Sequence, residues 1–298
     1  MTFDRNEGRP LVTVVIPSYN HERYIRQSIE SVVNQTYGNI QLIVIDDGSS
    51  DRSPEIIRGM AEEFSFEYIK QKNIGLPKTL NKAIALAKGK YFVSFGSDDI
   101  MFLDRIEKQV VFMEAHPEFK ITSGNVIFVN EEGEEAVVQK PRATRILEFD
   151  DIFLNRQPGI QAAGAMVERE LFSVHGEYDP DIPLEDIYMW LKLLSLGHRA
   201  YILEDNLAYY RKHSRNTYKN IPYMLDAVLK TIESYSYHSD YNAVKNRILK
   251  SHFMAASKKD GAQALAIFMR ISVRYYSLKL VRGLARCGLY YAKKPYFK

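Results

Sequence analysis

The first hundred residues alternate between two kinds of hydrophobic spacing. Apolar residues, many of them β-branched or aromatic, predominate at residues 11–17, 40–46 and 91–95, which is typical of strands buried in a sheet, and residues 66–71 are expected to form a shorter strand. Between them, apolar residues recur at helical spacing in three segments: residues 22–36, 53–64 and 77–89. This alternation predicts βαβ units and an α/β fold with a mostly parallel sheet.

The pattern becomes less regular after residue 102. Helices are expected at residues 103–117 and 185–197, because apolar residues recur there every three or four positions. Residues 120–138 predict a hairpin with its turn at Glu132 and Gly133.

From Asn220 onward the chain shows only helical periodicity. We therefore expect an α/β domain over residues 1–218 and a helical extension over residues 219–298. With 298 residues, of which 46% are hydrophobic and 26% charged, the chain can bury a sizeable core. Its single cysteine, Cys287, excludes an internal disulfide and fits a reducing compartment. Neither an apolar signal segment nor a membrane-spanning run is found, which predicts a cytoplasmic protein.

Charge is distributed unevenly along the chain. Residues 270–298 contain eight Lys or Arg and no Asp or Glu, which gives this segment a net charge of +8. Because the whole chain has a net charge of +3, residues 1–269 have a net charge of −5. The tail has tyrosine pairs at 275–276 and 290–291, and five apolar residues close to one helical stripe: Ile267, Ile271, Leu278, Val281 and Ala285. Such a segment, residues 262–298, is typical of docking on an anionic membrane. A nucleic-acid contact and a plain packing helix are the alternatives.

Polar clusters follow three of the expected strands. They read SYNHE after the first strand, DDGSSD after the second and GSDD after the fourth. Because ligands bind beyond the carboxyl ends of the strands in open parallel sheets, the three clusters predict one binding site. The last cluster places Asp98 and Asp99 side by side. Like charges this close repel each other, so a cationic partner is expected.

At these clusters the chain resembles the inverting glycosyltransferases of family 2, which have the GT-A fold. The matching segments cover about residues 11–215 and read VVIPSYNHE, IVIDDGSSD, NIGLPKTLNKAIALAKGKY, FGSDD, LEDIYMWLKL and YYRKH. The resemblance implies a Rossmann-like sheet flanked by helices, a nucleotide-sugar donor and inversion at the anomeric carbon. It does not identify the sugar.

The resemblance also implies how the nucleotide is held. Tyr19 would lie against the base and Asp47 would hydrogen-bond it, which suits uracil with its N3–H donor and favours a UDP-sugar. A core tyrosine and a turn aspartate are the alternatives. The further nucleotide contacts that we expect are Pro17, Lys78, Ser97 and Asp98.

For the carboxylate pair, the resemblance implies a metal. Asp98 would bind Mg²⁺ or Mn²⁺, which prefer hard carboxylate oxygens, and Asp99 would make supporting contacts. His213 matches a position that often adds a metal contact, and Arg211 would pair with a phosphate oxygen. A structural or merely exposed histidine is the alternative. The metal, bound together with the donor diphosphate, would then be the cationic partner that the two adjacent carboxylates require.

The segment LEDIYMWLKL matches the general-base motif of the family. Asp186 would be the base, with Glu185 beside it. Acidic residues are also ordinary in the first turn of a helix, where the helix dipole favours them. The acceptor pocket is expected around Gly164 and Trp190. Small residues near Gly164 would leave room for a sugar, although they also suit close packing.

Two positions depart from the family pattern. Gly96 stands where an aspartate commonly helps to hold the ribose, and Leu80 stands where an arginine is common near the diphosphate, a role that Lys78 would take. These departures keep open a non-catalytic nucleotide-binding or scaffold protein of the same fold. A nucleotidyltransferase is a second alternative, although its glycine- and arginine-rich phosphate loop is missing.

The expected function is therefore metal-dependent, inverting transfer of a sugar to a glycan or polyprenyl-linked acceptor. The product would belong to a surface polysaccharide such as O-antigen, capsule or exopolysaccharide. Because such acceptors are often lipid-linked, the resemblance favours a membrane surface over nucleic acid as the partner of the tail, at the inner face of the cytoplasmic membrane.

Overall fold

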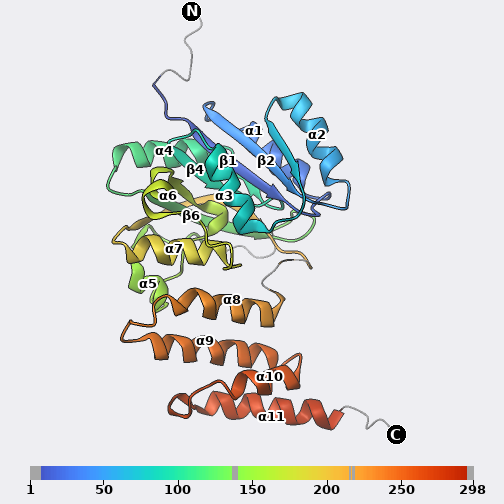
Figure 1. Ribbon diagram of the computed structural model, residues 1–298, viewed down its shortest axis with the longest axis vertical. Coiled ribbons are helices and arrows are strands. Elements are labelled where there is room, and N and C mark those ends of the chain that lie inside the picture. Colours follow the sequence, from blue (N-terminus) through green and yellow to red (C-terminus); the bar gives the residue numbers. More distant parts are fainter. Residues whose placement is uncertain (1–7, 136–139, 215, 217–218, 294–298) are drawn as a thin grey trace, which may run out of the picture. The chain divides into compact units, whose positions relative to one another are not determined.

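The computed structural model describes residues 8–135, 140–214, 216 and 219–293, and the chain divides into two compact units, Met1–His213 and Ser214–Lys298. The first unit is built on one nine-stranded mixed sheet. Its strands are β1 (Val12–Ser18), β2 (Ile40–Asp47), β3 (Glu67–Gln71), β4 (Tyr91–Ser94), β5 (Ile100–Met101), β6 (Ile121–Val129), β7 (Arg145–Leu147), β8 (Met166–Glu168) and β9 (Ala200–Arg211). They follow the order β3-β2-β1-β4-β8-β6-β9-β5, with β7 paired to β9 (Figure 1).

The parallel half of the sheet confirms the expected α/β class. Strand β1 pairs in parallel with both β2 and β4, and β2 pairs in parallel with β3. The register sets Ser18 opposite Asp46, so β1 and β2 end at the same edge. The polar clusters that follow these strands therefore start from one edge of the sheet, as the sequence predicts.

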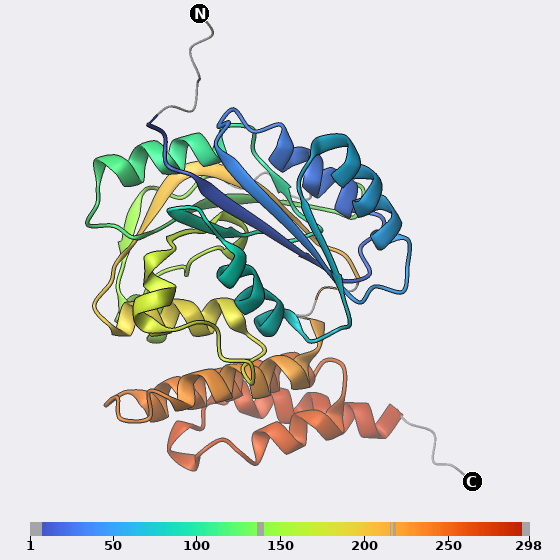
Figure 2. The same cartoon turned by 45° about the horizontal axis from the view of Figure 1, so that its top comes forward.

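Helices cover both faces of this sheet (Figure 2). They are α1 (Ile25–Val33), α2 (Ser53–Phe64), α3 (Leu76–Leu86), α4 (Arg105–Ala115), α5 (Phe149–Phe153), α6 (Glu170–His175) and α7 (Glu185–Ser195). Side chains of α1, α2 and α4 share one hydrophobic cluster with Val14 and Ile16 of β1, and those of α3, α6 and α7 share the other with Val15. Because neighbouring side chains of a strand point to opposite faces, this continuous apolar run serves both layers.

The other half of the sheet differs from the sequence-based expectation. Strand β9, which was not predicted, pairs with β6 in parallel along most of its length. The hairpin predicted for residues 120–138 accounts for only part of the pairing of β6, since β8 and β9 are its neighbours in the sheet. The chain does reverse at Gly133, which has a φ of 90°, but among the described residues the returning segment makes one bridge, between Val129 and Glu135. Residues 136–138 of that prediction lie outside the described part.

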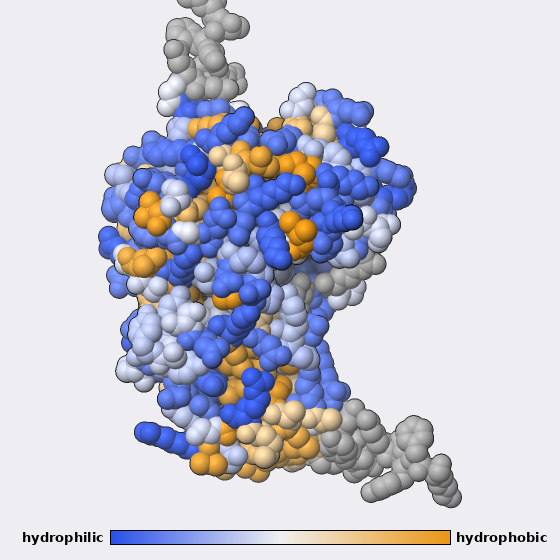
Figure 3. Space-filling view, viewed as in Figure 1, coloured by the Kyte–Doolittle hydropathy of each residue, from blue (hydrophilic) through white to orange (hydrophobic). Residues whose placement is uncertain are grey.

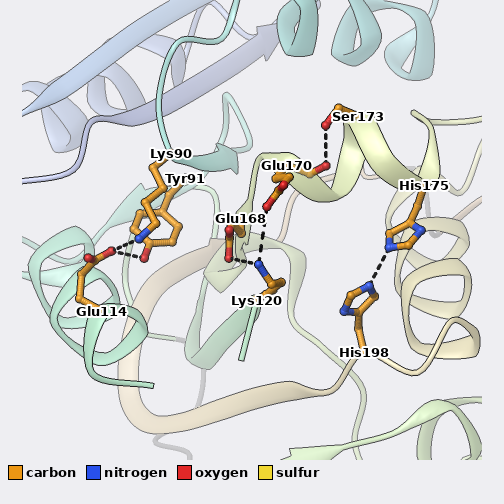
Figure 4. Close-up of polar contacts among 9 residues, drawn as sticks. All are labelled: Lys90, Tyr91, Glu114, Lys120, Glu168, Glu170, Ser173, His175 and His198. Atoms are coloured by element: carbon orange, nitrogen blue, oxygen red, sulfur yellow. Dashed lines mark hydrogen bonds and ion pairs between the residues drawn. The ribbon is translucent and has the colours of Figure 1, made fainter. Parts of the chain in front are cut away.

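Polar contacts join several of these elements at the surface (Figure 4). Three groups are drawn there, and each links segments that are distant in sequence: Glu114 with Lys90 and Tyr91, Lys120 with Glu168 and Glu170, and His175 with His198. The first group joins α4 to β4, and the last joins the end of α6 to the residues that follow α7. The histidine Nε2 atoms lie 2.8 Å apart, so one ring must donate to the other.

The second unit is helical, as expected. Its helices are α8 (Ile221–Glu233), α9 (Tyr241–Ala256), α10 (Gly261–Phe268) and α11 (Leu278–Lys293). The single apolar stripe predicted for the tail is wrong, because α10 and α11 are separate helices. Ile267 and Ile271 are buried in the core of this unit, whereas Leu278 and Val281 are 85% and 60% exposed. The side chains of Tyr290 and Tyr291 lie outside the described part. None of the described helices is long and apolar enough to cross a membrane.

Candidate active site

Two residues predicted as metal ligands meet at the edge of the sheet. Asp98 follows β4 and His213 follows β9, and Asp98 Oδ2 lies 2.8 Å from His213 Nε2. A third residue, His21, comes from the loop after β1. One potential ligand atom from each of these three side chains lies within 4.8 Å of the others. His21 was not predicted as a ligand, although it stands in the SYNHE cluster that the sequence had singled out.

The donor set of this cluster fits a divalent cation. The carboxylate of Asp98 suits both Mg²⁺ and Mn²⁺, and imidazole nitrogens are common ligands of divalent transition metals. His21 Nδ1 also lies 2.7 Å from the hydroxyl of Ser97, a contact that fixes the ring beside the cluster. Asp98, His21 and His213 are thus the residues that would hold an ion.

The two adjacent carboxylates have opposite electrostatic environments. Burial acts to raise the pKa of Asp98, but the hydrogen bond with His213 and the nearby His21 outweigh it and bring that pKa below its ordinary value. Burial and the charge of Asp98 raise the pKa of Asp99 well above its ordinary value. One carboxylate is therefore ionised more readily than the other, which reduces the repulsion between them.

Arg211 supports the cluster from within the protein. Its backbone N–H donates to Asp99 Oδ1 at 2.9 Å, and its Nε donates to the carbonyl of Asp98 at 2.9 Å. The rest of the guanidinium donates to the carbonyls of Asn130 and Glu131 and to Oε1 of Gln27. This side chain is 2% exposed. The structure therefore uses Arg211 to join the ends of strands, and the phosphate contact that the sequence predicts stays a prediction.

Gly96 departs from the family pattern for a steric reason. A Cβ atom at this position would lie 2.8 Å from Asp99 Oδ2 and 2.9 Å from Asp98 Oδ1. The carbonyl of Gly96 also accepts a hydrogen bond from the hydroxyl of Ser28. An aspartate here would have to displace both carboxylates, so the glycine and this arrangement of the carboxylates belong together.

The predicted nucleotide residues lie at the ends of β1 and β2, after β4 and in the first turn of α3. Tyr19 is 50% exposed, as a residue that stacks on a base needs to be. The carboxylate of Asp47 accepts hydrogen bonds from the backbone N–H groups of Ile74 and Gly75, so it orders the loop after β3. Lys78, in the first turn of α3, is exposed.

Asp46 was missed by sequence reasoning at this edge. It is fully buried, and its Oδ1 has no hydrogen-bond partner; the same is true of the Ser18 hydroxyl, in the residue opposite it on β1. Pro17 precedes Ser18 and lies opposite Ile45. Unpaired buried polar atoms are rare in folded proteins, and here they occur next to the strand ends that are predicted to hold the nucleobase.

Asp186, the predicted general base, lies in a separate small cavity of about 30 Å³. Glu185 and Asp186, in the first turn of α7, line it together with Leu80, Phe92, Ser94, Ala162, Ala165, Val167, Tyr178 and Trp190. Burial and the charge of Asp186 raise the pKa of Glu185 to about 8, and burial raises the pKa of Asp186. Carboxylates with raised pKa values are suited to accept a proton near neutral pH.

Trp190 and Leu80 contribute differently to this cavity. The indole N–H of Trp190 is buried without a hydrogen-bond partner among the described residues, so it offers a donor beside the base. Leu80, the second departure from the family pattern, is fully buried and lines the same cavity.

A turn over residues 162–164, η1 (Ala162–Gly164), forms one wall of this cavity. Arg105, which is fully buried, donates to the carbonyls of Ala163 at 2.6 Å and Ala165 at 2.9 Å. Gln109, one turn later on α4, donates to the carbonyl of Gly164 at 3.0 Å. Gly164 itself packs against β6, where a Cβ would lie 3.1 Å from the Ser123 hydroxyl. Arg105 carried no signal in the sequence, because an arginine in an amphipathic helix is ordinarily exposed.

Comparisons with known proteins show the family of this chain. The family model described as Glycosyl transferase family 2 matches residues 13–175. EpsE of Bacillus subtilis is 32% identical over 222 residues, covering 70% of this chain and 75% of its own. TuaG, a teichuronic acid biosynthesis glycosyltransferase of the same species, is 31% identical over 209 residues, covering 68% and 79%.

Solved structures share the fold at low identity. TarS of S. aureus, residues 1–349 in complex with UDP-GlcNAc, has a TM-score of 0.60 at 15% identity and covers 96% of this chain and 93% of its own. The mannosyltransferase PcManGT of Pyrobaculum calidifontis, in complex with GDP-Man and Mn²⁺, has a TM-score of 0.63 at 17% identity, with coverages of 96% and 88%. The chain belongs to glycosyl transferase family 2 and is a transferase with the GT-A fold.

Proposed function

We propose that this chain is a metal-dependent inverting glycosyltransferase that moves a sugar from a nucleotide-sugar, with UDP favoured, to a hydroxyl of a glycan or polyprenyl-linked acceptor. The 2.8 Å contact between Asp98 and His213 carries the proposal, because it brings two distant strand ends into one cluster of metal-ligating side chains. UDP-GlcNAc in TarS and GDP-Man with Mn²⁺ in PcManGT support the donor class and the cofactor, Mg²⁺ or Mn²⁺.

The donor would be held by the residues at the ends of β1, β2 and β4. Tyr19 presents an exposed ring to the base, and the loop that Asp47 orders would close beside it. Asp98, with His213 and His21, would hold the divalent ion. When bound, the ion supplies positive charge next to the diphosphate of the donor. Pro17, Ser97 and Lys78 would complete the contacts with the nucleotide.

The acceptor would be activated by Asp186. Its carboxylate takes the proton of the acceptor hydroxyl while the hydroxyl oxygen forms a bond to the anomeric carbon. The bond from that carbon to the diphosphate oxygen breaks, and its electron pair leaves with the nucleotide diphosphate. Attack from the opposite face inverts the configuration, so an α-linked donor gives a β-linked product. Glu185 and Trp190 would orient the acceptor beside the base.

The proposed reaction assigns a different role to each of the two parts of the chain. Residues 1–218 would form the catalytic domain and residues 219–298 a helical extension. The named function of TuaG, teichuronic acid biosynthesis, supports a place in surface polysaccharide synthesis, such as that of O-antigen, capsule or exopolysaccharide.

The extension would dock on an anionic membrane surface. Met269, Val273 and Leu278 are 76–85% exposed in or beside the segment that connects α10 with α11. Figure 3 shows apolar side chains gathered over α10 and α11. Lys and Arg are the only charged residues from position 270 onward, which suits anionic lipid headgroups.

A donor screen tests the proposal. Purified chain is incubated with UDP-, GDP- and dTDP-sugars, and the released nucleotide is measured with Mn²⁺, with Mg²⁺ and with a chelator. We expect release from a UDP-sugar that depends on the metal. Formation of a nucleotide-sugar from a nucleoside triphosphate and a sugar phosphate would instead support a nucleotidyltransferase.

A further inference from the structure

A second cavity, of about 50 Å³, lies beside β6 and is lined by cationic and amide side chains. The polar residues around it are Asn125, Lys140, Arg142, Arg145, Gln161 and Asn206. No carboxylate is among its lining residues. Within the described part of the chain, none of its three cations forms an ion pair. Three positive charges with no carboxylate among them are an arrangement that a bound anion would balance.

Arg145 is the most exceptional of these side chains. Its Nε and NH1 atoms are buried without a hydrogen-bond partner. Burial and the charge of Arg142 both lower the pKa of Arg145, and no neighbouring group acts to raise it. A buried guanidinium donor without an acceptor is costly, because its hydration is lost and nothing replaces it. A bound oxyanion would remove this cost, since the planar guanidinium matches the oxygens of a phosphate or a carboxylate.

Local backbone structure builds the cavity. The pairing of β6 with β9 shifts register on either side of Asn125, and the bulge lies next to Gly124, where a Cβ would be 2.6 Å from Leu207. A bulge of this kind redirects the side chain beside it. The amide of Asn125 donates to the carbonyls of Arg142 and Glu204, both at 2.8 Å. It thus fixes the backbone that carries Arg142 against β9.

The cavity shares a wall with the one that contains the candidate base. Gln161 lines the cationic cavity, and its neighbour Ala162 lines the cavity of Asp186. The hydroxyl of Ser123 donates to the carbonyl of Gln161 at 2.9 Å and holds this wall to β6. A group bound beside Arg145 would therefore lie next to the acceptor side of the reaction.

We propose that the Arg145 cavity binds an anionic oxygen group, phosphate or carboxylate, that the acceptor carries. That the acceptor carries this group follows from the proposed transfer reaction, whereas the anion site itself follows from the residues of the cavity. A space of this size admits one compact group and not a sugar ring. The acceptor is therefore an acidic molecule, with either a phosphate next to the accepting sugar or a uronic acid in the chain.

Calorimetric titration of the full chain tests this directly, with inorganic phosphate and glucuronate as separate probes. Arg145→Gln should weaken the binding of the preferred probe about tenfold or more, since it removes a charge-assisted pair. Arg142→Gln should weaken it less, because that side chain is exposed. Arg26→Gln is the matched control: Arg26 lies on α1 with its side chain 57% exposed, and its loss should leave binding unchanged.

Further arms separate the outcomes. Binding should persist in Asp98→Ala, which excludes the donor site as its location. Preference for phosphate or for glucuronate identifies the acidic group. If Arg145→Gln does not fold, the proposal is judged on Arg142→Gln, which should bind the preferred probe more weakly than the wild-type chain. The proposal is overturned if the wild-type chain binds neither probe, or if both arginine variants bind as wild type does. Because no donor is used, the result is independent of the proposed transfer reaction.

Discussion

Asp98 Oδ2 and His213 Nε2 lie 2.8 Å apart, although 115 positions separate the two residues in the chain. The short strand β5 explains this contact. Ile100 pairs with Tyr209 of β9, so the loop that carries Asp98 runs beside the end of the strand that leads to His213. The backbone of Arg211 then bonds to Asp99 and fixes the register. The proposed metal site is therefore built by sheet pairing rather than by one local motif.

Gly96→Ala should disturb this site more than its size suggests. The added Cβ would come within 3 Å of both carboxylates, so we expect a loss of about 1–3 kcal/mol in the free energy of unfolding and loss of metal-dependent nucleotide binding. Chemical denaturation and calorimetry measure the two effects. Gly59→Ala in α2 is the control, because its Cβ would meet nothing within 4 Å and alanine favours the helix. Equal behaviour of the two variants would refute the steric explanation.

Asp186→Asn should reduce kcat by about 10²–10⁴ and leave the donor affinity nearly unchanged. The amide keeps the shape of the side chain but is a far weaker base. Steady-state kinetics with a UDP-sugar and calorimetric donor binding separate the two quantities. A variant with wild-type kcat would show that Asp186 is not the base.

Raised pKa values at Glu185 and Asp186 make stability depend on pH. The folded chain keeps a proton on Glu185 up to about pH 8, whereas the unfolded chain releases it near the ordinary value of 4.5. The free energy of unfolding should therefore fall as pH rises from about 4.5 to about 8. Glu185→Gln removes this titration, so denaturation curves across that range should show a weaker pH dependence. An unchanged slope would contradict the assignment.

Arg105→Met should destabilise the first unit by about 3 kcal/mol. The change leaves the buried carbonyls of Ala163 and Ala165 without donors, and it removes a positive charge that lowers the pKa of Asp99. Arg52→Met, at a side chain that is 78% exposed, should change stability by less than about 0.5 kcal/mol. Urea denaturation compares the two variants, and similar losses would contradict a special role for Arg105.

Membrane docking is tested by one substitution and a matched control. Val281 on α11 and Val111 on α4 are 60% and 61% exposed. Val281→Glu should reduce co-sedimentation with phosphatidylglycerol vesicles, and Val111→Glu should not; added salt should weaken wild-type binding. Substitution is preferable to truncation after Asp260, which would remove core residues of the second unit. Equal sedimentation of both variants would place membrane contact elsewhere.

Most of the parallel half of the fold could be predicted because three of its strands are largely apolar. Strands β1, β2 and β4 are buried along most of their length, and strands that are covered on both faces consist mainly of apolar residues. Strand β9 escaped prediction because Glu204, Asp205 and Asn206 interrupt its pattern where the sheet has a bulge. Its pairing with β6 is also non-local, which periodicity does not encode.

The site was predicted only where a motif marked it. Asp98, Asp186 and His213 stand in recognisable segments, and the structure places Asp98 and His213 in one cluster. Arg105 and Arg145 have no such signal, since an arginine with buried guanidinium atoms looks like any surface arginine in the sequence. Their importance depends on burial and on partners from distant segments, which only the fold reveals.

Asp98→Ala in the donor assay is the most direct test of the proposed function. The assay measures nucleotide release from a UDP-sugar with Mn²⁺, together with calorimetric binding of UDP in the presence and absence of the metal. If Asp98 holds the ion with His213, the variant should lose transfer and the part of UDP affinity that depends on Mn²⁺, while metal-free binding stays as in the wild type. Wild-type activity that persists with a chelator, or an Asp98→Ala variant with unchanged metal-dependent binding, would contradict the account.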